Sequence, residues 1–185
     1  MTTHDTHEPT ETLYEGQWLR MRRRGHWEFA ERTHGKGMAV IVIAVTPEDN
    51  VLFVEQHRVP LGASTIEMPA GLVGDDHSTD TLESAAGREL IEETGWAAQR
   101  LEVLLVGPTS AGLTSERIAF VRARGLTRVG AGGGVDNENI VVHEVPRALA
   151  PAWLMQKQRE GYELDLKLWA GLWMLEHNPD GTPAD

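Results

Sequence analysis

The sequence contains no cysteine, which excludes disulfide scaffolds, thiol nucleophiles and zinc sites built on cysteine. Its longest apolar run, from Met38 to Val45, has eight residues, whereas a helix that crosses a bilayer needs roughly 20. Residues 1–11 contain no basic segment followed by an apolar one. We therefore expect no secretory signal, no membrane partner and a cytoplasmic location.

Positive charge is also scarce, because 17 Lys and Arg residues stand against 28 Asp and Glu residues, a net charge of −11. A field of this sign repels nucleic acid, so we expect no nucleic-acid partner. It leaves open an acidic enzyme that recruits metal ions. With 41% apolar and 24% charged residues, a chain of 185 residues can bury the core of one ordinary domain.

The order of the expected elements indicates an α/β fold with helices packed on a mixed sheet. Polar residues at 1–11 and the Pro- and Gly-containing residues 178–185 predict disordered tails. Alternating or continuous apolar runs predict strands at 17–24, 27–32, 38–46, 51–58, 101–106, 117–124 and 140–145. Helices are expected at 81–94, 147–159 and 164–177.

The first expected helix has clear boundaries. Thr81 can cap its N-terminus, Glu83 suits the positive first turn, and Gly95 can end it.

Three carboxylates share one face of this helix, because Glu89, Glu92 and Glu93 are spaced i, i+3 and i+4. Like charges at this spacing cost about 0.2–0.5 kcal/mol per pair. Arg88 can neutralise part of the cluster, and a hard divalent cation, Mg²⁺ or Mn²⁺, would neutralise the rest. Taken alone, such a cluster is more typical of a solvated acidic helix face than of a metal site.

The segment Gly74–Trp96, GDDHSTDTLESAAGRELIEETGW, resembles the signature of Nudix hydrolases, Gly-x5-Glu-x7-Arg-Glu-U-x-Glu-Glu-x-Gly-U, where U is a bulky apolar residue. It departs from the signature at Asp80, which stands in place of a glutamate. The resemblance implies a Nudix fold, a mixed β-sheet sandwiched by helices, and hydrolysis of a pyrophosphate bond.

Two further segments resemble the ADP-ribose and nucleoside-diphosphate-sugar branch of that family. Glu67–Gly71 resembles its Glu-x-Pro-Ala-Gly strand end, with a three-residue insertion in the loop Leu72–Thr79 that follows. Ser110–Arg117 resembles its Ser-Pro-Gly-x-Thr-Ser-Glu-Arg loop. Ala111 replaces the proline that helps to mark ADP-ribose specificity, so the preferred substrate within the branch stays open.

The same resemblance assigns a metal site. It implies that Glu89 and Glu93 bind Mg²⁺ or Mn²⁺, and that Glu92 is a further ligand or holds a metal-bound water. The backbone carbonyl of Ala70 would complete the site, and Arg88 would orient the glutamates through charge-assisted hydrogen bonds.

A second acidic segment supplies the candidate general base. Asp136–Ile140 resembles the Glu-Asn-Glu-Asp-Ile loop of the same branch, which places Glu138 on its catalytic glutamate and Asp136 on an acidic neighbour near the substrate. Gly130–Gly134 has four glycines in five residues and is expected to be a mobile hinge for closure of this loop. A solvated acidic turn is the alternative.

The resemblance also implies substrate contacts. Arg58 ends a segment similar to Glu-Gln-x-Arg and would face the diphosphate, because a guanidinium fork suits phosphate oxygens. Glu116 would contact the terminal ribose.

The N-terminal strands resemble the small antiparallel lobe that this branch exchanges between the subunits of a homodimer. We assign residues 12–36 to this lobe and residues 37–177 to the Nudix domain. Trp27 or Glu28 would then reach the partner's base-binding pocket, with an aromatic ring stacked on the base, and Arg32 would touch phosphate. Burial of Trp27 in the dimer interface is the alternative.

Together these features predict a Mg²⁺-dependent hydrolase of a nucleoside diphosphate sugar similar to ADP-ribose, giving a nucleoside monophosphate and a sugar phosphate. Two alternatives stay open. One is a Nudix pyrophosphatase for dinucleotides or modified nucleotides, and the other is a sensor that binds nucleotide without cleaving it.

Overall fold

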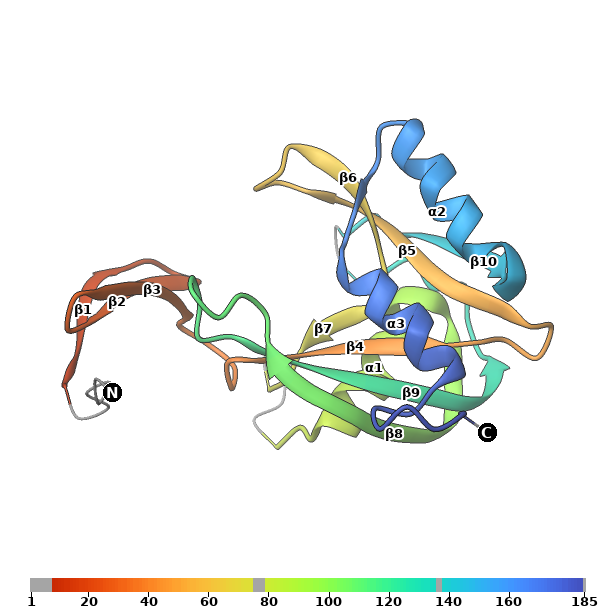
Figure 1. The fold of residues 1–185 in the computed structure, drawn as a ribbon, viewed down its shortest axis with the longest axis horizontal. Coiled ribbons are helices and arrows are strands. Elements are labelled where there is room, and N and C mark those ends of the chain that lie inside the picture. The colour runs from red at the N-terminus through yellow and green to blue at the C-terminus, as the bar shows by residue number, and fades with distance from the viewer. Residues whose placement is uncertain (1–7, 75–78, 136–137, 185) are drawn as a thin grey trace.

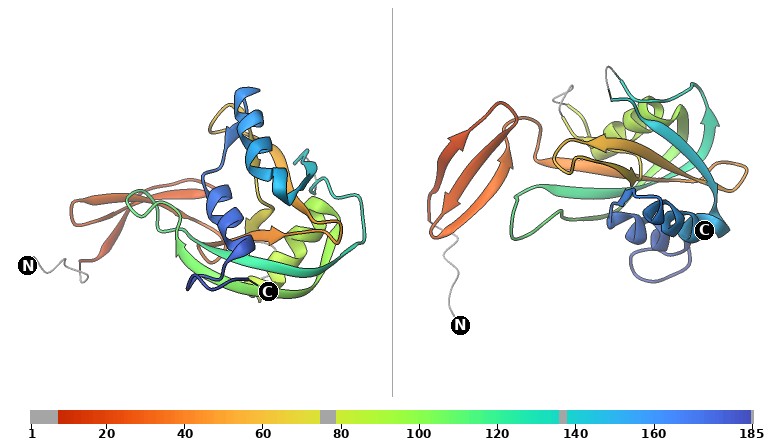
Figure 2. Two further views of the ribbon diagram at one scale, coloured as in Figure 1. Left: turned by 45° about the vertical axis from the view of Figure 1, so that its right-hand side comes forward. Right: turned by 90° about the horizontal axis from the view of Figure 1, so that it is seen from above.

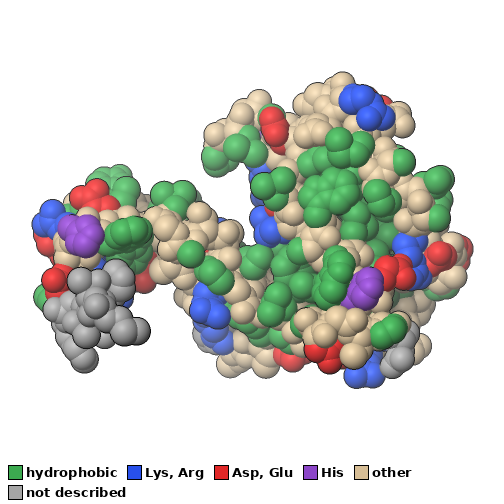
Figure 3. Space-filling view, in the orientation of Figure 1, with side chains coloured by type: hydrophobic (Ala, Val, Ile, Leu, Met, Phe, Trp, Pro, Cys, Tyr) green, Lys and Arg blue, Asp and Glu red, His purple; other side chains and the backbone are tan. Residues whose placement is uncertain are grey.

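The computed structural model describes residues 8–74, 79–135 and 138–184. Strands β1 (Thr10–Glu15), β2 (Leu19–Arg24) and β3 (Trp27–Arg32) form an antiparallel three-stranded sheet, the N-terminal lobe. This lobe projects from the rest of the molecule (Figures 1 and 3). It is tied to the body where Ala30 exchanges hydrogen bonds with the backbone of Leu113 and Ser115.

The body contains two four-stranded mixed sheets and the helices (Figure 1). One sheet has the order β7 (Ala70–Leu72), β4 (Met38–Ala44), β9 (Arg117–Arg128) and β8 (Trp96–Pro108). The other has the order β10 (Val141–Pro146), β5 (Asn50–Arg58), β6 (Ala63–Glu67) and β11 (Glu163–Leu164). The helices are α1 (Leu82–Thr94), the 3₁₀ turn η1 (Arg147–Leu149), α2 (Ala150–Arg159) and α3 (Lys167–Glu176). The expected α/β Nudix architecture with an N-terminal antiparallel lobe is confirmed.

Strand β4 is apolar throughout because both of its faces are buried. Val40 and Val42 pack toward α1, whereas Ile41 and Ile43 belong to a second core that α2 and α3 cover. Seen from above, α1 and α3 lie on opposite sides of β4 (Figure 2). The sheet is therefore the middle layer of the body.

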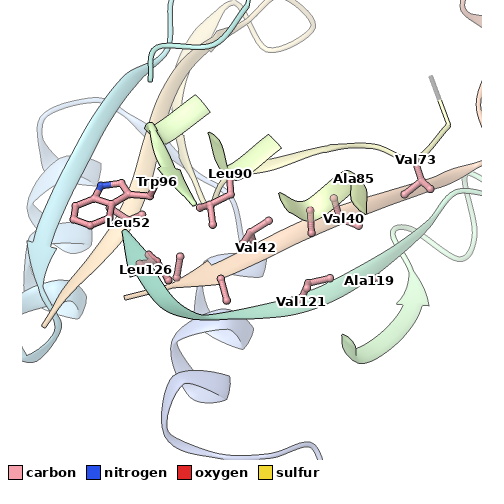
Figure 4. Packing of buried hydrophobic residues seen from close by; sticks show 13 residues of the cluster. Val40, Val42, Leu52, Val73, Ala85, Leu90, Trp96, Ala119, Val121 and Leu126 are labelled. Atoms are coloured by element: carbon pink, nitrogen blue, oxygen red, sulfur yellow. The ribbon is translucent and has the colours of Figure 1, made fainter. Parts of the chain in front are cut away.

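Helix α1 has the boundaries that its sequence predicts. Thr81 caps it in a capping box with Ser84, and Gly95 ends it with a positive φ of 75°. Ala85 and Leu90 point into the core against β4 and β9 (Figure 4). Since these apolar positions fix one side of the helix to the sheet, Glu89, Glu92 and Glu93 lie on another side of it, with Glu93 buried.

Parts of the chain expected to be disordered make defined contacts. Strand β1 begins at Thr10, inside the expected N-terminal tail. The buried guanidinium of Arg122 donates to the carbonyls of Met174 and His177 at 2.7 and 2.9 Å, and to the Asn178 side chain at 3.0 Å. A backbone hydrogen bond from Asn178 to Thr182 then closes a turn. A cation at the C-terminal end of α3 thus holds the segment that follows.

Among the described helices, none combines the length and the apolar character that a membrane span requires.

Candidate active site

A cavity of about 470 Å³ lies beside the carboxylate side of α1. Its lining residues come from β3, β4, β5, β7, α1 and the loop before β10. The predicted site residues that line it are Arg32, Arg58, Ala70, Arg88, Glu89, Glu92, Glu93 and Glu138. Residues about 100 positions apart in the sequence therefore meet at one cavity.

Glu93 is the most deeply buried of the cavity glutamates, with 5% of its surface exposed. Its Oε2 accepts a hydrogen bond from the backbone N–H of Ala70 at 3.0 Å. This contact joins α1 to the start of β7, and Ala70 itself lines the cavity.

Arg88 is the cation of the cluster. Its guanidinium lies 2.8 Å from Glu89 and 3.2 Å from Glu92, and it also donates to the carbonyl of Leu72 at 3.3 Å. One side chain thus orients two of the predicted metal ligands and fixes the strand β7 beside them.

Burial raises the pKa of Glu93 to about 8, and repulsion from Glu89 and Glu138 adds to the rise, against the hydrogen bond from Ala70. Burial likewise raises the pKa of Glu89 to about 7; Arg88 opposes this, and Glu92 and Glu138 reinforce it. The cavity therefore holds more acidic groups than its own cations neutralise.

This imbalance predicts an unusual pH dependence of stability. Glu89 and Glu93 stay protonated in the folded chain at pH values where the unfolded chain, with an ordinary pKa of 4.5, has released both protons. The metal-free protein should therefore lose a few kcal/mol of unfolding free energy as the pH rises from 5 to 8.5, since one pKa unit is about 1.4 kcal/mol. Urea unfolding in EDTA measures this loss.

Two further measurements test whether Glu93 and the metal site cause this loss of stability. Glu93→Gln should lessen the loss, because glutamine does not ionise, and Mg²⁺ should restore stability at high pH by binding the deprotonated groups. A slope as steep in Glu93→Gln as in the unaltered chain would contradict the role given to Glu93.

The oxygen donors suit a divalent cation of the Mg²⁺ type, which prefers carboxylate and carbonyl ligands. As placed, no three acidic or histidine side chains of the described residues converge into a group that could hold an ion. Arg88 instead draws Glu89 and Glu92 to itself. Binding of a cation would thus require these side chains to turn toward it.

Gly71 leaves the space that the carboxylate of Glu89 occupies. A Cβ at this position would overlap that carboxylate and lie 2.5 Å from its Cγ. Gly71→Ala should displace the Glu89 side chain and weaken Mn²⁺ binding by about 10–100-fold, the usual cost of disturbing the support of a metal ligand. Calorimetric titration with Mn²⁺ measures the change.

Gly107→Ala is the matched control, because Gly107 also lies in a strand and a Cβ there meets nothing within 4 Å. Equal Mn²⁺ affinities in the two variants would show that Glu89 does not bind the ion.

Arg58 lies at the cavity but is engaged by Glu67, which holds it through two hydrogen bonds of 2.6 and 2.7 Å. Burial acts to raise the pKa of Glu67, yet the hydrogen bonds from Arg58 and Thr65 outweigh burial and hold that pKa below its ordinary value. The pair fixes the direction of the guanidinium in the cavity.

The other predicted substrate contacts lie in different places. Glu116 is ion-paired with Arg32 and lines a smaller neighbouring cavity of about 110 Å³. Trp27 and Glu28 are exposed on β3, and neither lines the cavity beside α1. Asp136 lies outside the described residues.

Sequence reasoning missed a charged pair at the start of α3. The ammonium of Lys167 lies 2.6 Å from the carboxylate of Asp165, and both line a cavity of about 610 Å³ that shares Arg58 with the site. The sequence contains a signal that Lys167 has another role than stabilising the helix. A lysine in the first turn opposes the helix dipole, and Leu166 offers no side-chain cap.

Comparisons with known proteins agree with this geometry. The model of the NUDIX domain matches residues 35–162, more than half of the chain. The chain belongs to the Nudix family. It is 33% identical over 151 residues to an ADP-ribose pyrophosphatase of Escherichia coli, a match that covers 77% of this chain and 68% of that one.

This Nudix chain also matches a methanol dehydrogenase activator of Bacillus methanolicus, with 39% identity over 105 residues. That match covers 56% of this chain and spans about half, 54%, of the relative. A crystal structure of an ADP compounds hydrolase shares the fold, with a TM-score of 0.62 and 16% identity over 83% of this chain and 92% of that one. Nudix hydrolases generally use divalent metal cations.

The departure of this chain from the Nudix signature has a structural account. Asp80 lies 3.6 Å from the guanidinium of Arg88 and accepts a hydrogen bond from Ser84 at 3.2 Å. It supports Arg88 and the first turn of α1, and it does not line the carboxylate cavity.

Proposed function

We propose that this protein hydrolyses the pyrophosphate bond of a nucleoside diphosphate sugar similar to ADP-ribose, with Mg²⁺ or Mn²⁺ as its cofactor. The observation that carries the proposal is one cavity lined by four glutamates and three arginines. Its relatives include ADP-ribose and ADP-sugar pyrophosphatases.

The residues present suit each part of that reaction. A divalent cation held by Glu89, Glu92, Glu93 and the carbonyl of Ala70 would neutralise pyrophosphate oxygens and lower the pKa of water. Arg58 and Arg32, which line the same cavity, would bind phosphate oxygens. The divalent cation and the two guanidinium groups would offset the negative charge of the pyrophosphate, which otherwise repels a nucleophile.

Glu138 is the proposed general base. In the step it serves, a water oxygen bonds to one phosphorus and the bond from that phosphorus to the bridging oxygen breaks. The water proton passes to Glu138, and the leaving phosphate keeps the electron pair of the broken bond. Glu138 lines the same cavity as Glu89 and Glu93 and raises the pKa of both, which supports a role beside the proposed metal site.

The proposal extends to a homodimer. Trp27 on the projecting lobe is 54% exposed, and Trp18, Leu19 and Met21 are also exposed there. Exposed apolar side chains gathered on a protruding lobe suit burial against a second copy, which would bring Trp27 and Glu28 to the partner's site. Light scattering on the intact chain measures its mass.

The substrate test is a panel of ADP-ribose, other ADP-sugars, dinucleoside polyphosphates and oxidised nucleotides, each with Mg²⁺ and with EDTA. Phosphorus NMR identifies the products. Nucleoside monophosphate plus sugar phosphate from ADP-sugars alone supports the proposal. Cleavage of another ADP-sugar in preference to ADP-ribose would agree with Ala111, which replaces the proline that helps to mark ADP-ribose specificity. Preference for dinucleotides or modified nucleotides would support the second candidate. Binding without cleavage would contradict both.

A further inference from the structure

The glycine segment Gly130–Gly134 lies backbone against backbone on the C-terminal end of α1. The amide of Gly133 donates to the carbonyl of Glu93 at 2.8 Å, and that of Gly134 donates to the carbonyl of Glu92 at 3.0 Å. Gly130 donates to the carbonyl of Gly95 at 3.0 Å. These bonds satisfy carbonyls that the end of a helix leaves without partners, and two of them belong to predicted metal-binding residues.

Only glycine permits this approach at position 132. A Cβ there would lie 2.5 Å from the carbonyl carbon of Thr94 and 2.6 Å from the carbonyl oxygen of Glu93. Both are backbone atoms, which cannot swing aside as a side chain can. Gly132 also has a φ of 73°, in the left-handed region.

The far end of the segment leads to Glu138. The Oε2 of Glu138 accepts from the amide of Val135 at 2.9 Å, and the amide of Glu138 donates to the carbonyl of Val135 at 3.2 Å. Ile140 donates to the carbonyl of Gly133 at 3.1 Å and closes the loop. The two ends of the loop that carries Glu138 therefore meet at Gly133, whose amide is hydrogen-bonded to the carbonyl of Glu93.

We propose that Gly132 is a positioning residue, whose close contact with α1 sets Glu138 at a fixed place relative to the glutamates of that helix. From the sequence we expected these glycines to form a mobile hinge; in this proposal they are an anchor. The inference rests on the proposed hydrolase function, since it acts through Glu138.

The test is a double-mutant cycle between Gly132→Ala and Glu138→Gln, with ADP-ribose and Mg²⁺. A displacement of about 1 Å can cost about 100-fold, so Gly132→Ala should lower kcat by about 10–100-fold and change KM less than threefold. In the Glu138→Gln background the same change should cost less than about twofold, because the group it displaces no longer acts. Gly181→Ala, with a φ of 85° and no atom within 4 Å of its Cβ, is the control for backbone strain and should keep the wild-type rate.

Two measurements that do not depend on activity distinguish loss of this contact from loss of the fold. Amide exchange should show Gly133 and Gly134 protected in the unaltered chain and exposed in Gly132→Ala, with Mn²⁺ affinity changed less than threefold. If Gly132→Ala does not fold, amide exchange in the unaltered chain still tests the contact, because the amides of Gly133 and Gly134 are hydrogen-bonded to α1 only while the segment is docked there.

Equal losses of kcat in both backgrounds, or an unchanged rate in Gly132→Ala, would overturn the inference. Fast exchange of both amides in the unaltered chain would do so as well. Failure of the wild-type chain to cleave any member of the substrate panel would contradict the proposed function instead. In that case the amide exchange data alone would test whether the segment is docked on α1.

Discussion

Glu93→Gln is expected to lower kcat for ADP-ribose hydrolysis by about two to three orders of magnitude, the size of loss seen when one electrostatic group is removed from a reaction of this kind. Glutamine can still accept the hydrogen bond that Ala70 donates to Glu93 at 3.0 Å, so the fold should be kept. What it cannot supply is the negative charge that a divalent cation needs. Steady-state rates over a range of Mg²⁺ concentrations measure the effect.

Glu83→Gln is the matched control, because Glu83 lies in the first turn of the same helix and does not line the cavity. It should retain the wild-type rate and the wild-type response to Mg²⁺. Near-normal turnover in Glu93→Gln would remove Glu93 from the metal site.

Glu138→Gln is expected to lower kcat by about 10²–10⁴-fold, the usual contribution of a general base. Because this side chain is proposed to accept a proton and not to bind the cation, affinity for Mn²⁺ should change little. Pre-steady-state rates and calorimetry on the same preparation separate the two effects.

If Glu138→Gln weakens Mn²⁺ binding in step with the rate, Glu138 is a ligand and another group is the base. An unchanged rate would exclude it from the reaction altogether.

Local sequence signals were sufficient for the helix that carries the site. The cap at Thr81, the stop at Gly95 and the three glutamates on one side are set by residues within a few positions of each other. The long apolar strand β4 was also predicted, since burial on both faces produces a continuous apolar run.

Contacts between distant segments were not predictable in the same way. Strand β11 has two residues and exists because it pairs with β6, about 100 positions earlier. The glycines of Gly130–Gly134 were interpreted as a hinge because glycine favours flexibility, whereas here it permits close contact with Thr94 and Gly95. Neither contact leaves a periodic pattern in the sequence.

The charge state of the site could be predicted from the sequence only in part. The sequence places Glu89 and Glu93 together, but their raised pKa values, about 7 and about 8, come first from burial. Burial depends on the packing of β7 and the loop of Glu138 over the helix, which only the folded chain provides.

The most direct test of the metal site is a crystal grown with Mn²⁺ and a non-hydrolysable analogue of ADP-ribose. Anomalous scattering should place manganese among Glu89, Glu92, Glu93 and the carbonyl of Ala70, against the diphosphate of the analogue. Manganese bound elsewhere, or an analogue seated away from α1, would contradict the account.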